Sequence, residues 1–415
     1  MKYAHLGDLH LGAWREQKMR DLSTKSFLMA IDQCVQQEVD FILFTGDLFN
    51  TSLPSLDTLK IVTKKLKELQ DRNIPLYVIA GSHDFSPSGK TMIDVLDSGG
   101  LLVNVCKGKV NPETKELHLQ FTIDRKTGAK ITGVLGRRGL LDKTYYESLH
   151  REDLEQEPGY KIFMFHTTIA ELLPQHLEMM ESQPISVFPK KFQYYAGGHI
   201  HHPTKKEIPE YGTVTYSGAL FPNNFQEIEK YSYGGYFIIT VDHGAPRTQI
   251  QKVEWMPLQV IEHKALVLDC TDKSPEVIGF EVVEVFQNQD LHNCLITLRL
   301  KGTVQGGKIG SINFKEIFER LTAQGAYCIL KNTAKLQSEE FKEIALAQQN
   351  PEEIEEVLIK EHLQQVSLFD LDTEKELTKT MLTCMNTIKN EGETSSDFQA
   401  RIESEMNQLL QLELR

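Results

Sequence analysis

The sequence has little of what marks membrane proteins or disulfide-stapled secreted proteins. Its hydrophobic runs stay well short of the roughly 20 residues that span a bilayer. Because a strand-like run already begins at Lys2, we expect no signal peptide. The 6 cysteines are scattered without Cys-x-x-Cys spacing, which favours reduced core thiols over a disulfide framework or a zinc ribbon. We therefore expect a cytoplasmic protein without a membrane span.

The chain also lacks an overall excess of positive charge. Its formal net charge is −13 over 415 residues, which argues against DNA binding by the whole surface. Local basic strips remain open, such as Lys60, Lys64, Lys65 and Lys67 on one predicted helix, although a solvated helix face explains them more simply. The length and an ordinary composition, 40% hydrophobic and 25% charged, predict two or three globular domains.

What the chain does contain is a recurring pattern, in which a strand-like run ends in a metal-ligand residue type. Residues 3–6 lead into Gly7-Asp8-Leu9-His10, and residues 39–45 lead into Gly46-Asp47. The arrangement recurs before Gly81-Ser82-His83-Asp84, before His166 and before Gly198-His199-Ile200-His201. Because the carboxyl ends of parallel strands meet at one edge of a sheet, where such folds bind ligands, these side chains are expected to converge.

Each block taken alone has a plainer interpretation. A Gly-Asp after a strand is usually a turn, and a single histidine is more often a core or surface side chain. Their repetition in one chain favours a metal site. Oxygen and imidazole ligands without thiolates suit Mn, Fe, Zn or similar divalent ions. With one shared carboxylate they suit a two-metal centre that activates water for displacement at phosphorus.

These motifs resemble the ordered signature of the calcineurin-like metallophosphoesterases. The residues around them, in particular 46–50 and 81–89, are similar to one branch of that family. This branch is the nuclease subunit of the double-strand-break repair complex, of the "meiotic recombination eleven" or SbcD type, in an archaeal-like version. The motifs that carry the resemblance lie within residues 1–220.

The resemblance implies a set of ligands for two Mn²⁺ ions, with other divalent metals possible. One ion would be held by Asp8, His10 and His201, the other by His166 and His199, and Asp47 would bridge them.

The resemblance also implies roles beside the metals. His83 would be the general acid or the residue that orients the phosphate, held in place by Asp84. The sequence departs from the family at Ser82, where asparagine is usual, and at Asn50, where many relatives carry a histidine. Ser82 stays a candidate ligand of the second ion, although a hydroxyl is a weaker ligand than an amide oxygen.

The expected fold class is α/β, a metallophosphoesterase sandwich of β-sheets flanked by helices. Residues 1–257 would form the nuclease domain, residues 258–335 a small α+β capping domain, and residues 336–415 a helical tail. In the first domain, helices are expected over residues 21–37, 55–72, 90–98 and 145–154, and a hairpin over 236–255. In the second, strands are expected over residues 265–268, 281–286, 293–300 and 327–330, and a helix over 313–324. In the tail, helices are expected to open at residues 350–351 and at Thr373, and a last one to carry residues 398–410.

The function implied by the resemblance is that of a Mn-dependent DNA nuclease. It would act as a 3'-5' exonuclease and single-strand endonuclease on DNA ends, as a homodimer, with an SMC-like coiled-coil ATPase of the SbcC type held by the tail helices. The apolar stripes of those helices are equally open to docking on the protein's own domains. Two other functions also remain open, a small-molecule phosphomonoesterase or cyclic phosphodiesterase, and a DNA-end tethering scaffold.

Overall fold

The computed structural model describes residues 1–85, 89–137, 142–177, 179–242, 248–338, 359, 370–387, 389–390, 393 and 395–410. The chain divides into two compact units. The first comprises Met1–Lys264 with Asn293–Thr297, and the second comprises Ala265–His292 with Leu298–Arg415.

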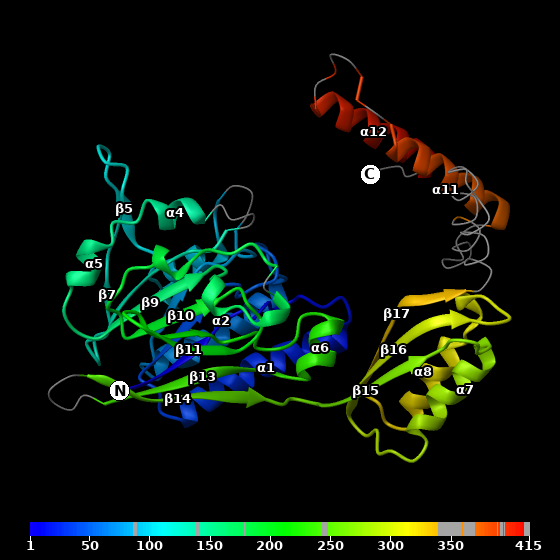
Figure 1. Ribbon diagram of the computed structural model, residues 1–415, viewed down its shortest axis with the longest axis horizontal. Helices are drawn as coiled ribbons and strands as arrows, with labels where there is room; N and C mark the ends of the chain where they lie inside the picture. The colour runs from blue at the N-terminus through cyan, green and yellow to red at the C-terminus, as the bar shows by residue number, and fades with distance from the viewer. Residues whose placement is uncertain are drawn as a thin grey trace. The chain divides into compact units, whose positions relative to one another are not determined.

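Two 6-stranded sheets form the centre of the first unit (Figure 1). The first sheet has the order β14 (Gln249–Leu258), β13 (Gly234–Asp242), β1 (Lys2–Leu6), β2 (Phe41–Thr45), β3 (Leu76–Ile79) and β4 (Val103–Asn104). The second has the order β11 (Thr204–Ile208), β12 (Gly212–Tyr216), β10 (Tyr194–Gly198), β9 (Lys161–His166), β8 (Lys130–Val134) and β7 (Thr122–Ile123). The α/β sandwich expected from the sequence is therefore confirmed.

The central strands run parallel within each sheet, so their carboxyl ends share an edge. Strand β1 pairs in parallel with β2, and β2 with β3. In the second sheet β9 pairs in parallel with β8 and β10, and β10 with β12. The facing sides of the two sheets enclose one apolar core, which includes Phe41 and Ile79 from the first sheet and Ile162 and Met164 from the second. Because both faces of β2 and β3 are covered, these two strands are mostly apolar along their whole length.

Helices cover the outer faces of both sheets. On the first sheet lie α1 (Gln17–Gln36), α2 (Leu56–Asp71) and α3 (Met92–Ser98), as expected for 21–37, 55–72 and 90–98. On the second lie α4 (Lys143–Glu147), α5 (Glu152–Gln156) and the short 3-10 turns Ala170–Leu172 and Ile185–Val187. The unit is completed by a third 3-10 turn (Gln175–Leu177), helix α6 (Phe225–Tyr231), and the two-stranded ribbon of β5 (Gly108–Val110) and β6 (Leu117–Leu119).

The single helix expected over residues 145–154 is wrong. Helices α4 and α5 are separate because the residues between them join strand β6. Leu149 forms a parallel bridge with Leu117, and the N–H of Leu117 donates to the carbonyl of Ser148 at 2.8 Å. This pairing is between residues far apart in the chain, so helical spacing gave no sign of it.

After β14 the chain forms a three-stranded sheet of β15 (Glu262–Asp269), β16 (Cys294–Val304) and β17 (Cys328–Ser338). The start of β15 and the start of β16 are counted with the first unit, and the rest of the sheet with the second. The second unit also contains helices α7 (Pro275–Phe286) and α8 (Phe314–Ala323) and a 3-10 turn at Ile309–Ser311. The strand expected over residues 281–286 is wrong, because these residues belong to α7. The Ser274 side chain caps this helix by accepting from the N–H of Val277, and proline occupies the first turn. Ile278, Val282 and Phe286 are buried at a spacing of four, which outweighs the strand preference of β-branched residues.

In the tail the structure describes helices α11 (Leu371–Met385) and α12 (Ser395–Leu410), which contact each other. Helix α11 begins earlier than expected, because Asp370 is its cap and accepts from the N–H of Thr373 at 3.1 Å. The helix expected to open at residues 350–351 lies outside the described residues. Within the described part of the chain, every helix is too short or too polar to cross a bilayer.

Candidate metal centre

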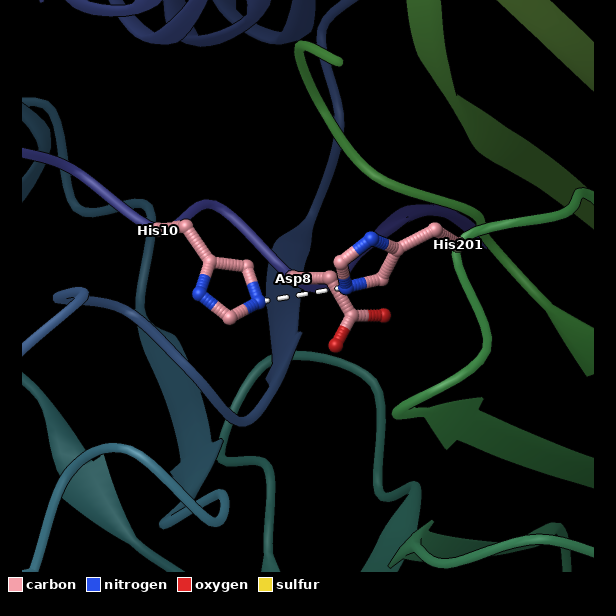
Figure 2. A group of neighbouring side chains, drawn as sticks. All are labelled: Asp8, His10 and His201. Carbon is pink, nitrogen blue, oxygen red and sulfur yellow. Dashed lines mark hydrogen bonds between the residues drawn. The ribbon is translucent and has the colours of Figure 1, made fainter. Parts of the chain in front are cut away.

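The candidate ligands lie together at the carboxyl ends of parallel strands. Ligand atoms of Asp8, His10 and His201 all lie within 4.8 Å of one another, and so do those of Asp8, Asp47 and His166. Figure 2 shows the first of these groups, in which side chains from the start of the domain meet one from beyond β10. Aromatic rings of His166 and His199 lie 5.2 Å apart, centroid to centroid. The structure thus brings together every ligand candidate of the two predicted ion sites.

Asp47 lies at the centre of this group. Its Oδ2 is 3.2 Å from Nε2 of His166 and 3.5 Å from Nε2 of His10. The hydroxyl of Ser82 donates to the same oxygen at 3.3 Å, while Oδ1 accepts from the backbone N–H of His83 at 2.7 Å. One carboxylate therefore lies between histidines of both predicted ion sites, which is the position that a bridging ligand needs.

The histidine rings are oriented by partners that sequence reasoning missed. Nδ1 of His166 donates to the carbonyl of Thr45 at 2.7 Å, and Nδ1 of His201 bonds to Oε1 of Glu227 at 2.9 Å. In each ring this leaves Nε2 to face the centre, as is typical of metal-binding histidines. Glu227 lies in the first turn of α6, three residues after the cap Asn224, and neither this helix nor a role for Glu227 was predicted from the sequence.

The donor atoms fit bound cations. Nε2 of His10 and Nε2 of His201 point at each other across 3.2 Å (Figure 2). Nε2 of His166 is a buried nitrogen without an aligned hydrogen-bond partner. One cation in front of His10 and His201 and another in front of His166 would use the lone pairs of these nitrogens. A donor set of imidazole nitrogen and carboxylate oxygen suits divalent Mn, Fe or Zn.

The backbone is strained where it presents the ligands. Asp8, His10, Asp47 and His199 have φ angles of 50°, 43°, 51° and 88°, in the left-handed region that costs about 1–3 kcal/mol per non-glycine residue. Hydrogen bonds between the loops hold this conformation. The N–H of His10 donates to the carbonyl of Asp47 at 2.9 Å, and the N–H of His199 donates to the Asp8 carboxylate at 2.9 and 3.0 Å. In this backbone conformation the side chains of all four residues face the same centre.

Asp84, which was expected to hold His83 in place, contacts main-chain groups of the neighbouring loops. The Asp84 carboxylate accepts from the backbone N–H groups of Asp47 at 2.9 Å and Gly81 at 2.8 Å. The His83 ring is instead oriented through Nδ1, which lies 2.9 Å from the carbonyl oxygen of Asn50. Asp84 therefore joins the two loops that carry Asp47 and His83. Asn50 acts through its main chain, so its side chain is not needed for this contact.

Burial and one ion pair set the charges of the centre. Burial raises the pKa of Asp8 to about 6 and lowers the pKa values of His10 to about 3 and His199 to about 4. Burial would also raise the pKa of Asp47 and lower that of His166. Their mutual contact reverses both effects, lowering the pKa of Asp47 and raising that of His166 to about 10. A divalent cation must displace the proton of this pair, so metal binding releases protons.

Two of the four lysines of the basic strip considered on α2 are paired with carboxylates of the protein itself. Nζ of Lys65 bonds to Asp32 at 2.6 Å and to Glu68 at 2.9 Å, and Lys67 pairs with Asp71 at 2.9 Å. These lysines are neutralised by neighbours on the protein itself. The plainer interpretation, a solvated helix face, fits Lys67, whose side chain is 56% exposed, whereas the side chain of Lys65 is only 11% exposed and is held in ion pairs.

Residues 1–203 match the family model of the calcineurin-like phosphoesterases. This part of the chain is a calcineurin-like phosphoesterase domain. Its curated relatives include proteins named DNA double-strand break repair protein Mre11. The one from Methanococcus maripaludis is 30% identical over 57% of this chain and 61% of its own length. Those from Archaeoglobus fulgidus and Methanopyrus kandleri are 28% and 26% identical, over 55% and 63% of this chain and 52% and 59% of their own lengths. The chain thus spans less than two thirds of each of these relatives.

Proposed function

We propose that the protein is a Mn²⁺-dependent DNA nuclease that processes double-strand-break ends, as a 3'-5' exonuclease and single-strand endonuclease. The observation that carries the proposal is the convergence of Asp8, Asp47, His166 and His201 on one point. It occurs in a phosphoesterase domain whose curated relatives are named as DNA break repair proteins.

The donor geometry supports one ion held by Asp8, His10 and His201 and another held by His166 and His199. Asp47 would serve both ions, and Ser82 would reach the second through the hydroxyl that now donates to Asp47. When bound, such a pair of ions supplies an activated water and stabilises charge on the phosphate.

His83 is placed to move a proton beside these ligands. Its ligand atom lies within 4.8 Å of those of His10 and Asp47, and its Nδ1 is already used by the Asn50 carbonyl. With Nδ1 oriented in this way, Nε2 would donate to the leaving oxygen of a phosphodiester as a general acid. Asp84 acts as a positioning residue, because it fixes the loops that carry Asp47 and His83.

End-labelled duplex DNA incubated with the purified protein and Mn²⁺ tests the activity. We expect shortening of the labelled strand that EDTA abolishes. His83→Ala should lower the rate by about 10²-fold or more, the usual contribution of a general acid, without lowering the Mn²⁺ content. His292→Ala, which removes an exposed histidine of the second unit, is the matched control and should cleave normally.

Two other results, from a phosphate-ester assay and from DNA-binding and metal-content measurements on the same protein, would contradict the proposal. Rapid hydrolysis of nitrophenyl phosphate esters without Mn²⁺-dependent loss of DNA would identify a small-molecule phosphomonoesterase or cyclic phosphodiesterase. DNA-end binding with one tightly held ion and no hydrolysis would identify a tethering scaffold.

We also propose partners for the exposed apolar side chains. Leu56 on α2 and Val95 on α3 are 83% and 61% exposed, and a second copy of the chain would cover them in a homodimer. Met385 on α11 is 68% exposed, and the coiled coil of an SMC-like ATPase of the SbcC type would cover the α11–α12 pair.

Light scattering on the chain, alone and mixed with that ATPase, tests both partners. We expect the mass of a dimer alone and of a joint complex in the mixture. Leu56→Glu with Val95→Glu should give a folded monomer with unchanged far-UV circular dichroism, because both side chains are exposed in the single chain. Val110→Glu, at a position 60% exposed on β5, should remain dimeric. A monomeric wild type, or ATPase that elutes separately, would contradict the respective assignment.

A further inference from the structure

A second group of histidines and carboxylates lies on the first unit and shares no residue with the candidate metal centre. Glu116 directly precedes β6, and His118 lies on it. His150 lies between α4 and α5, and Asp153 lies in the first turn of α5. Ligand atoms of Glu116, His118 and His150 lie within 4.8 Å of one another. These residues are only partly buried, so solvent ions reach them.

The backbone fixes the two histidines next to each other. Besides the bond from Leu117 to Ser148, the N–H of His150 donates to the carbonyl of Leu117 at 3.0 Å, which pairs Leu117 with Leu149 in parallel. Side chains alternate along paired strands. The residues that follow this pair, His118 and His150, therefore project on one face, and their ring centroids lie 4.4 Å apart with an interplanar angle of 24°.

Carboxylates face the nitrogens of both rings. Oδ2 of Asp153 lies 3.2 Å from Nδ1 of His118, and its Oδ1 lies 3.5 Å from Nε2 of His150. Oε2 of Glu116 lies 3.6 Å from Nδ1 of His150. Ion pairs with protonated histidines would account for these carboxylates. The ion pairs say nothing of the stacking of the two rings, which lie close enough for one cation to contact a nitrogen of each.

We propose that His118, His150 and Glu116 bind one divalent transition-metal ion, for which Zn²⁺ is the best match. Two imidazole nitrogens and one carboxylate oxygen are a three-residue Zn²⁺ donor set that leaves a position for water. Asp153 accepts from Nδ1–H of His118 and so turns Nε2 of that ring to the ion, as carboxylates do beside metal-binding histidines. The ion joins the β5–β6 ribbon to the start of α5.

Equilibrium dialysis of the full chain against Zn²⁺, followed by metal analysis, tests the site. The double variant His118→Ala with His150→Ala should hold one Zn²⁺ fewer per chain than the wild type, while its Mn²⁺-dependent phosphoesterase activity stays unchanged. Glu113→Ala removes an exposed carboxylate between β5 and β6 and is the matched control. It should hold as much Zn²⁺ as the wild type.

A conservative variant separates loss of a ligand from loss of the fold. Glu116→Gln keeps the size of the side chain and removes the carboxylate. It should weaken Zn²⁺ binding at this site by at least about tenfold, a loss already seen when only an orienting partner of a ligand is removed. Equal Zn²⁺ content in the wild type and the double variant, or unchanged Zn²⁺ affinity in Glu116→Gln, would overturn the proposal.

Discussion

Replacing Asp47 by asparagine should lower phosphodiester hydrolysis by about 10³-fold while the domain stays folded. The carboxylate lies within 3.5 Å of histidine nitrogens from both proposed ion sites. Asparagine has the same shape and tolerates the left-handed φ of 51° at this position. It lacks the second charged oxygen that two cations would share. The expected loss corresponds to the removal of a main source of charge stabilisation in the transition state.

The rate should be measured together with the number of Mn²⁺ ions bound per chain. We expect both to fall, with the far-UV circular dichroism unchanged. Asp124→Asn is the matched control, because Asp124 is also buried and accepts hydrogen bonds from Tyr77 and Thr127, outside the metal centre. Asp124→Asn should cost stability and leave the rate per folded molecule unchanged. Full activity in Asp47→Asn would contradict the proposal that Asp47 is a metal ligand.

From the sequence one could predict the types of the candidate ligands and the strands that precede them. The backbone conformation that turns these side chains toward one another could not be predicted. Apolar runs ending at Asp8, Asp47 and His166 predict parallel strands, and parallel strands predict a shared edge. The left-handed φ angles of Asp8 and Asp47 are invisible in the sequence, because propensity disfavours that conformation and only contacts between loops maintain it. Sequence reasoning therefore predicted which candidate ligands lie together, but not how their side chains are oriented.

Errors arose where a distant contact or a local cap outweighed propensity. Glu227 and Thr45 orient metal-facing histidines from positions 26 and 121 residues away, and no local pattern links those pairs. Asp84 was expected to act on its neighbour His83, but it clamps the loop of Asp47, 37 residues away. In α7 the signal was present, because Ser274-Pro275 is a helix start. There, the β-branched composition was given too much weight.

Gly81→Ala should disable the centre through a single added methyl group. A Cβ at position 81 would approach the backbone nitrogen and the carboxylate of Asp47 closer than 3.0 Å. The φ of Gly81 is not in the left-handed region, so alanine adopts this backbone without strain and the whole effect is steric. Relief requires movement of the Asp47 loop or of Gly81, whose N–H also donates to Asp84. Overpacking of this kind costs about 1–3 kcal/mol of unfolding free energy.

Denaturant unfolding and Mn²⁺ titration of Gly81→Ala measure the two consequences separately. We expect a lower unfolding free energy and weaker Mn²⁺ binding, because the displaced Asp47 carboxylate can no longer face both His10 and His166. Gly99→Ala is the matched control. Its added Cβ would meet only carbonyl oxygens at 3.5 Å at the end of α3, an ordinary contact, so its unfolding free energy should stay within about 0.5 kcal/mol of the wild type. If Gly81→Ala bound Mn²⁺ with wild-type affinity, the close contact between Gly81 and Asp47 would not be needed to position the metal ions. That result would contradict the proposal that the position of the Asp47 carboxylate sets Mn²⁺ binding.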